Sequence, residues 1–81
     1  MNKAGKYWDE AFQSSLIKRM KQLRREYGYS QEEVIEATHL DISRYETGES
    51  TPSMRSIVKL CKFYHITLAE FFAPINYPSA Q

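Results

Sequence analysis

The chain has 81 residues, of which 42% are hydrophobic and 26% charged, and its formal net charge at pH 7 is +1. This length fits one domain with a small core, and so small a net charge does not by itself indicate nucleic-acid binding. The single cysteine excludes an internal disulfide and favours a reducing, cytoplasmic setting. No apolar run approaches the roughly 18 residues of a membrane span, and the N-terminus lacks the apolar segment of a signal peptide, so no membrane partner is expected.

The first predicted elements are an arm and a long helix. Residues 1–8 show no hydrophobic period and are expected to form the arm. A helix is predicted from the N-cap Asp9 to about Tyr27, where Gly28 follows as a stop signal. Its apolar stripe at helical spacing consists of Phe12, Leu16, Met20, Leu23 and Tyr27.

Two shorter helices are predicted next. Ser30 and Glu33 have the spacing of a capping box, so a second helix is expected to run from here to about Thr38. Its buried side is predicted to consist of Val34, Ile35 and Ala37. A very short third helix is predicted over residues 41–47, with Gly48 as its stop. The apolar residues available to it are Leu40, Ile42 and Tyr45.

The last two predicted helices complete an all-α fold. Pro52 suits the first turn of a fourth helix capped by Thr51. The apolar face of that helix consists of Met54, Ile57, Leu60, Cys61 and Tyr64. Thr67 and Glu70 form a second capping box, which opens a fifth helix that ends at Phe72. No alternating strand pattern appears, so we expect an arm (1–8), one helical domain (9–72) and a tail (73–81).

The order of these elements resembles the lambda-repressor-like (Xre/Cro type) helix-turn-helix family. The matching stretches lie within residues 17–72 and are IKRMKQLRREYGYSQEEV, ISRYETG, TPSMRSIVKLCKFYHI and TLAEFF. The resemblance implies a compact five-helix bundle whose second and third helices read double-stranded DNA, with the third helix in the major groove. It also implies a transcriptional regulator, often a dimer on a palindromic operator.

The resemblance also assigns roles to residues that do not lie on the outer face of the third helix. Unpaired N–H groups at the start of a helix attract phosphate, and in the family a glutamine at the position of Gln31, beside Ser30, contacts the DNA backbone. Arg24 lies at the edge of the first helix's apolar stripe, and Glu46 follows Tyr45. In the family these two positions form a partly buried ion pair that locks the first helix onto the third.

The candidate base-reading residues lie on the outer side of the third helix and in the turn before it. An arginine donates two hydrogen bonds to guanine, and a serine donates to a base or a phosphate. Arg44 and Ser43 are therefore the first candidates. The other outward positions are His39, Asp41 and Thr47.

The chain departs from the family at this reading edge. The interval from the Ser-Gln pair to the Glu-x-Gly is a few residues shorter than in typical members, and alignment of its ends places the gap at residues 39–41. The recognition-helix region is therefore shortened. His39 occupies a turn position where glycine often adopts positive φ, and Glu49 lies in a loop that is often basic.

These departures leave a second function open. The alternative to a DNA-binding regulator is a protein-interaction module on the same scaffold, such as an antitoxin-like or anti-repressor protein. An enzyme is disfavoured, because the sequence has no paired carboxylates and no glycine-rich phosphate loop. No cofactor is expected, and the Cys and His residues do not have metal-ligand spacing.

Several large apolar residues are not needed by the predicted core. Phe63 falls off the apolar face of the fourth helix, Ile75 and Tyr77 lie in the tail, and Tyr7 and Trp8 lie in the arm. Small domains rarely expose several such side chains without a use, so we expect a homodimer that uses this surface. The alternative is that Trp8 and the tail fold back over the first and fifth helices.

Overall fold

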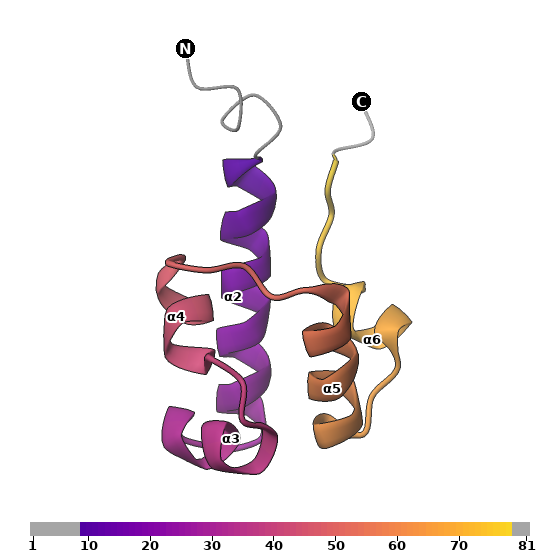
Figure 1. Ribbon diagram of the computed structural model, residues 1–81. Helices are drawn as coiled ribbons and strands as arrows, with labels where there is room; N and C mark the ends of the chain where they lie inside the picture. The colour runs from indigo at the N-terminus through magenta and orange to yellow at the C-terminus, as the bar shows by residue number, and fades with distance from the viewer. Residues whose placement is uncertain (1–8, 79–81) are drawn as a thin grey trace.

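The computed structural model describes residues 9–78, which form five α-helices and no strand. The helices are α2 (Glu10–Glu26), α3 (Gln31–Thr38), α4 (Ile42–Thr47), α5 (Met54–Tyr64) and α6 (Leu68–Phe72). In Figure 1, α4 stands on one side of α2, α5 and α6 stand on the other, and α3 lies near the C-terminal end of α2. The predicted all-α fold of five helices is confirmed.

Helix α2 is the central element, and its start follows from its cap. The Asp9 carboxylate accepts a hydrogen bond from the Phe12 backbone N–H at 2.9 Å, which satisfies one of the free donors of the first turn. Its buried side chains are Leu16, Arg19, Met20 and Leu23. Tyr27 was expected to share this stripe, but it is 46% exposed because it lies after the last helical turn, where its ring packs against Tyr64.

Helix α3 opens with the predicted capping box, in which Ser30 and Glu33 bond each other's backbone N–H groups. Val34 is buried as predicted, but Ala37 is exposed and Thr38 is buried in its place. Residues four apart lie on the same helix face, so Thr38 follows Val34 into the core. The Thr38 hydroxyl donates to the Val34 carbonyl at 2.7 Å, which makes its burial acceptable.

Helix α5 begins later than predicted. Its cap is Ser53, whose hydroxyl accepts a hydrogen bond from the Ser56 N–H at 3.2 Å, and not Thr51. Pro52 is buried just before the cap instead of lying in the first turn. A cap at Thr51 would be compatible with the proline after it, so the burial of Pro52 in the packed loop, and not helix propensity, places the cap at Ser53. Met54 was predicted to face the core, yet as the first residue of α5 it is 55% exposed.

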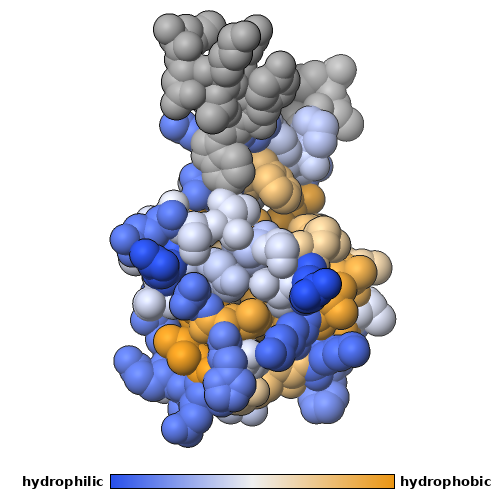
Figure 2. Space-filling model, in the orientation of Figure 1, coloured by the Kyte–Doolittle hydropathy of each residue, from blue (hydrophilic) through white to orange (hydrophobic). Residues whose placement is uncertain are grey.

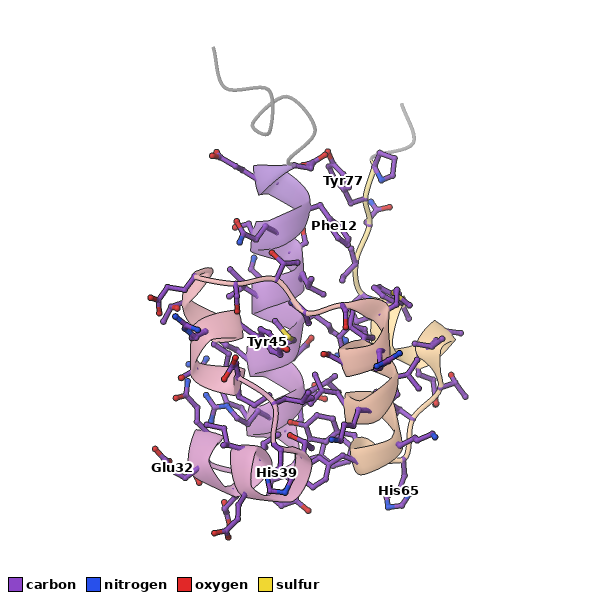
Figure 3. All side chains as sticks on the ribbon, viewed as in Figure 1. Phe12, Glu32, His39, Tyr45, His65 and Tyr77 are labelled. Carbon is purple, nitrogen blue, oxygen red and sulfur yellow. The ribbon has the colours of Figure 1, made fainter. Side chains whose placement is uncertain are left out.

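The five helices and the C-terminal segment enclose one core. Its buried apolar side chains come from every helix and are Leu16, Met20, Leu23, Val34, Ile42, Tyr45, Ile57, Leu60, Cys61, Tyr64 and Phe71. The segment after α6 returns along α2, where Ile75 packs against the core. Tyr77 lies beside Phe12, as Figure 3 shows, and its hydroxyl donates to the Asp9 carboxylate. The tail therefore folds back over α2, whereas Tyr7 and Trp8 fall outside the described residues.

Arg19 holds α6 against α2 from inside the protein. Only 8% of its surface is exposed, and its guanidinium donates to the Phe71 and Glu70 carbonyls at 2.6 and 2.8 Å and to Gln22 Oε1 at 3.0 Å. The last carbonyls of a helix have no partner within it, so this arginine satisfies two acceptors at the end of α6. The charged side chain acts as a cap between helices.

We expect Arg19→Met to lower the free energy of unfolding by about 2–3 kcal/mol, because it leaves buried carbonyls without the charged donor. Chemical denaturation measures the change. The matched control is Lys18→Met on the exposed side of α2, for which a change within about 0.5 kcal/mol is expected. Equal losses for the two variants would contradict the capping role of Arg19.

Candidate nucleic-acid interface

Helices α3 and α4 are joined by a tight turn of residues 39–41. The turn begins at His39, whose φ of 59° is left-handed, as expected for a position that often carries glycine. The Leu40 N–H donates to the buried Thr38 hydroxyl at 3.3 Å, which ties the turn to the end of α3. Asp41 precedes α4 but makes no side-chain capping bond. The turn places two helices side by side in a helix-turn-helix arrangement.

Helix α4 is very short and is held from two sides. It has six residues, which is about 9 Å of helix. The Tyr45 hydroxyl donates to Ser56 Oγ of α5 at 3.2 Å, and Gln13 Nε2 of α2 donates to the Gly48 carbonyl at 3.1 Å. Gly48 has φ 86°, and a Cβ there would lie 3.3 Å from Ile17 Cδ1. Glycine is therefore favoured at this position, because the left-handed φ strains any side chain and a Cβ would press on Ile17.

The outer face of α4 carries the residues predicted to read DNA. Ser43, Arg44 and Thr47 are exposed, as are Asp41 and His39 in the turn. The Thr47 hydroxyl donates to the Arg44 carbonyl at 3.2 Å, so its hydrogen-bond donor is already used within the helix. Among residues 9–78 the Arg44 guanidinium has no hydrogen-bond or ion-pair partner, which leaves its donors for an external acceptor.

Several exposed carboxylates belong to the same helix-turn-helix unit as Arg44. Glu32 and Glu36 are exposed on α3, Glu49 is exposed after α4, and Asp41 lies in the turn. Figure 3 shows Glu32 pointing away from the bundle on the side of α4. A phosphate backbone approaching α4 would be attracted by Arg44 and repelled by these groups, so the local charge favours only moderate DNA affinity.

Arg24 and Glu46 form a two-pronged ion pair behind α4. Arg24 Nε donates to Glu46 Oε2 at 2.8 Å, and Arg24 Nη2 donates to Oε1 at 2.9 Å. The Glu46 side chain is 2% exposed and that of Arg24 is 15% exposed. Paired planar groups of this kind give strong, directional hydrogen bonds. The pair therefore fixes α4 to the C-terminal half of α2.

The ion pair shifts the ionisation of both partners. Burial of Glu46 acts against its charge, but hydrogen bonds from Arg24 and Gln31 outweigh it and hold the pKa of Glu46 below its ordinary value. The nearby positive charge of Lys21 acts in the same direction. The pKa of Arg24 is raised, chiefly by its hydrogen bond to Glu46. The pair thus stays ionised at neutral pH.

Gln31, the predicted phosphate contact, opens α3 and touches the same ion pair. Its Nε2 donates to Glu46 Oε1 at 2.9 Å. Ser30 beside it is exposed, with its N–H and hydroxyl engaged by Glu33. Within the described chain the backbone N–H groups of Gln31 and Glu32 have no acceptor. Free amides at this helix start suit an anion, although Glu32 and Glu33 already place negative charge there.

Sequence reasoning missed two parts of this arrangement. Arg19 was not predicted to be buried, although it shares the helical spacing of Leu16 and Leu23, which is the signal for its burial. The bond between Gln31 and Glu46 joins residues on two helices, and no pattern within either helix indicates it. Arg24 Nη1 also donates to the Tyr29 carbonyl at 3.0 Å, which fixes the entry to α3.

The residues predicted to form a dimer surface are only partly free. Phe63 is half-buried, with ring centroids 5.0 Å from those of Tyr29 and Tyr64. Ile75 is also half-buried against the core, whereas Tyr77 is 39% exposed. A surface at Phe63 would include its neighbour Tyr29, which is 37% exposed.

Between residues 9 and 78, no three His, Cys, Asp or Glu side chains gather closely enough to hold a metal ion. None of the helices in this range combines the length and the apolar character needed to cross a membrane.

Comparison with known proteins gave one match. A helix-turn-helix family model, of the lambda-repressor-like type, matches residues 20–71, which is more than half of the chain. The matched segment contains all of α3, α4 and α5 and reaches into α2 and α6. Comparison with curated proteins gave no match, and neither did comparison with solved structures.

We expect Arg24→Ala to lower the free energy of unfolding by about 3 kcal/mol at pH 7, because it leaves the Glu46 carboxylate buried without its partner. Because the folded-state pKa of Glu46 lies below its unfolded value, the stabilisation from its charge is complete above that unfolded value, about 4.3. It is lost as pH falls through the folded-state pKa. The loss caused by Arg24→Ala should therefore shrink in strong acid.

Chemical denaturation at neutral pH and at several pH values below about 4 measures this dependence. The matched control is Arg25→Ala, which removes the same charge one residue along, at an exposed position. We expect a change within about 0.5 kcal/mol for this control. Similar effects for the two variants, or a loss for Arg24→Ala that is constant with pH, would contradict the role of the ion pair.

Proposed function

This chain belongs to the lambda-repressor-like helix-turn-helix family of DNA-binding regulators, and from that membership we propose a sequence-specific transcriptional regulator that reads operator DNA with α4. One observation supports the proposal most. Helix α4 is fixed on its inner side by α2 and α5, while Arg44 on its outer side keeps unused donors. A rigid helix with a free arginine suits base reading in a major groove. The proposal involves no catalysis and no cofactor.

The proposed contacts divide into two kinds. Gln31 and Ser30 at the start of α3 contact the phosphate backbone, where free N–H groups face outward. Arg44 contacts guanine from α4, with Ser43 beside it on a base or a phosphate. Of the remaining outward residues, Thr47 and His39 approach the backbone. Asp41 is limited to the amino groups of bases, such as that of cytosine, because a carboxylate only accepts hydrogen bonds.

The binding energy available from the outer face of α4 requires more than one copy of the protein on the DNA. One good two-pronged base contact discriminates by about 1–3 kcal/mol, whereas a specific complex exceeds non-specific binding by about 4–10 kcal/mol. A single α4 with one free arginine falls short of that range. We therefore propose a homodimer on two half-sites, with DNA shape contributing to recognition. This proposal implies the cytoplasmic location expected from the sequence.

We expect salt-dependent binding of moderate strength to duplex DNA, with different losses at the two kinds of contact. Arg44→Ala should remove about 1–3 kcal/mol of preference for a selected duplex over a random one. Gln31→Ala should weaken binding to both duplexes alike, because a phosphate contact carries no sequence information. Fluorescence anisotropy with selected and random duplexes at two salt concentrations measures both effects.

Arg55→Ala is the control, because Arg55 is exposed on α5, outside the helix-turn-helix. It should leave the preference between duplexes unchanged. If no duplex binds at about 50 mM salt, where phosphate contacts are strong, the DNA-binding proposal is wrong.

We also expect self-association, and sedimentation velocity tests it with and without an operator duplex. Figure 2 shows hydrophobic surface at the right edge of the molecule, over α5 and α6, bordered by hydrophilic side chains. Phe63 and Tyr77 add aromatic surface, so replacing Tyr77 by Ser should weaken a dimer that uses the tail. The tail variant Asn76→Ser, a small change at an exposed position, is the control. A monomer at high micromolar concentration in both conditions would refute the dimer.

A second function is favoured by the exposed carboxylates of the α3–α4 unit. Glu32, Glu36, Asp41 and Glu49 are all exposed near the α3–α4 unit, where DNA would approach. Such a surface suits a basic protein partner better than a phosphate backbone. The protein-interaction module is therefore the alternative, and the absence of DNA binding at low salt would favour it.

A further inference from the structure

The Glu46 carboxylate bonds to two helices other than its own. Both of its oxygens accept hydrogen bonds from Arg24 of α2, at 2.8 and 2.9 Å. Oε1 also accepts from Gln31 Nε2, at 2.9 Å, at the first residue of α3. One buried carboxylate thus joins α2, α3 and α4 at the point where the helix-turn-helix unit meets the central helix.

The bond to Gln31 differs in kind from the bonds to Arg24. Arg24 already gives Glu46 a full counter-charge, so the carboxylate does not need the amide for neutralisation. Gln31 lies at the surface end of this cluster and is only half-buried. Its side chain would otherwise rotate freely at the start of α3, as exposed glutamines do. The contribution of the bond is to hold the Gln31 amide in one orientation.

That orientation suits the proposed phosphate contact. An amide group has two N–H donors, of which one is used by Glu46 and the other is left for an external acceptor. The unpaired backbone N–H groups of Gln31 and Glu32 lie at the same helix start. The side-chain donor and the two backbone amides thus belong to the same helix start, where an anion is favoured.

We propose that Glu46 is a positioning residue for DNA-backbone binding: it holds the Gln31 amide, from behind, in the orientation that contacts phosphate. This inference rests on the proposed function, because it concerns the same contact. It assigns Glu46 a role in binding in addition to its ion pair. It also explains how a recognition region too short to carry many base contacts keeps its phosphate contact in place. Because the Gln31 side chain is already ordered in the free protein, DNA binding does not have to restrict it.

The test needs a variant that removes the carboxylate and still folds. Replacing both members of a buried ion pair by apolar residues of similar size is often neutral for stability, so we choose Arg24→Met with Glu46→Met. This pair variant leaves Gln31 without its acceptor. Glu46→Gln serves as the conservative variant, because its amide oxygen can still accept from both Gln31 and Arg24 Nη2.

The first measurement uses the free protein and NMR relaxation of the side-chain amides. In the wild type and in Glu46→Gln we expect the Gln31 amide to be as ordered as the backbone, whereas in the pair variant it should become mobile. Gln13 is the internal control, because its Nε2 donates to the Gly48 carbonyl and should stay ordered in all three proteins. A Gln31 amide that is equally ordered, or equally mobile, in the wild type and the pair variant overturns the inference.

The second measurement is a double-mutant cycle on DNA affinity, which separates positioning from a general effect on folding. The pair variant should weaken binding to random and selected duplexes alike by about fivefold, the cost of ordering one side chain. When Gln31→Met is present, the pair variant should cost less than about twofold more, because its effect acts through Gln31.

The two measurements distinguish the possible failures. Equal losses with and without Gln31 overturn the positioning role while leaving DNA binding intact. If the wild type binds no duplex, the proposed function is wrong and the positioning role falls with it, whatever the NMR result.

Discussion

The shortness of α4 is the constraint on which the rest of the site depends. A helix of six residues has no stability of its own in water, since isolated helices need about 12–15 residues to be even marginal. Its position therefore comes entirely from its neighbours. Glu46 binds α2, Tyr45 binds α5, and the residue that ends α4, Gly48, accepts a bond from Gln13 of α2. These contacts face inward, so α4 is fixed without using Ser43 or Arg44.

The turn before α4 is strained, and local bonds offset the strain. His39 has φ 59°, a region that costs residues other than glycine roughly 1–2 kcal/mol. The Thr38 hydroxyl bonds forward to Leu40 and back to Val34, so the turn is tied to the helix before it. A glycine at this position would remove the strain, but it would also raise the conformational entropy of the unfolded chain. His65 ends α5 in the same conformation, where Ile66 follows into a half-buried position.

How far the sequence predicts this protein depends on the range of each interaction. The capping boxes of α3 and α6 were predicted correctly, because both partners lie within one turn of chain. The start of α5 was wrong because Thr51 and Ser53 are both good caps and only the surrounding packing selects Ser53. The burial of Arg19 was not predicted, because the carbonyls that accept its hydrogen bonds lie about 50 residues further along the chain. The bond from Gln31 to Glu46 depends on how α3 meets α4, which no pattern within a helix specifies.

The Glu46 carboxylate contributes to the stability of the fold and, under the proposed function, to DNA binding. The carboxylate that neutralises Arg24 inside the fold also accepts a hydrogen bond from Gln31, which it is proposed to orient. A change at Glu46 therefore acts on both properties, whereas Arg44 projects from α4 and can change without loss of the fold. Under the proposed function, sequence preference would be free to vary at the outer face of α4, while the proposed phosphate contact would remain linked to the core. A short recognition helix gains from this division, because its few outward side chains need not also hold it in place.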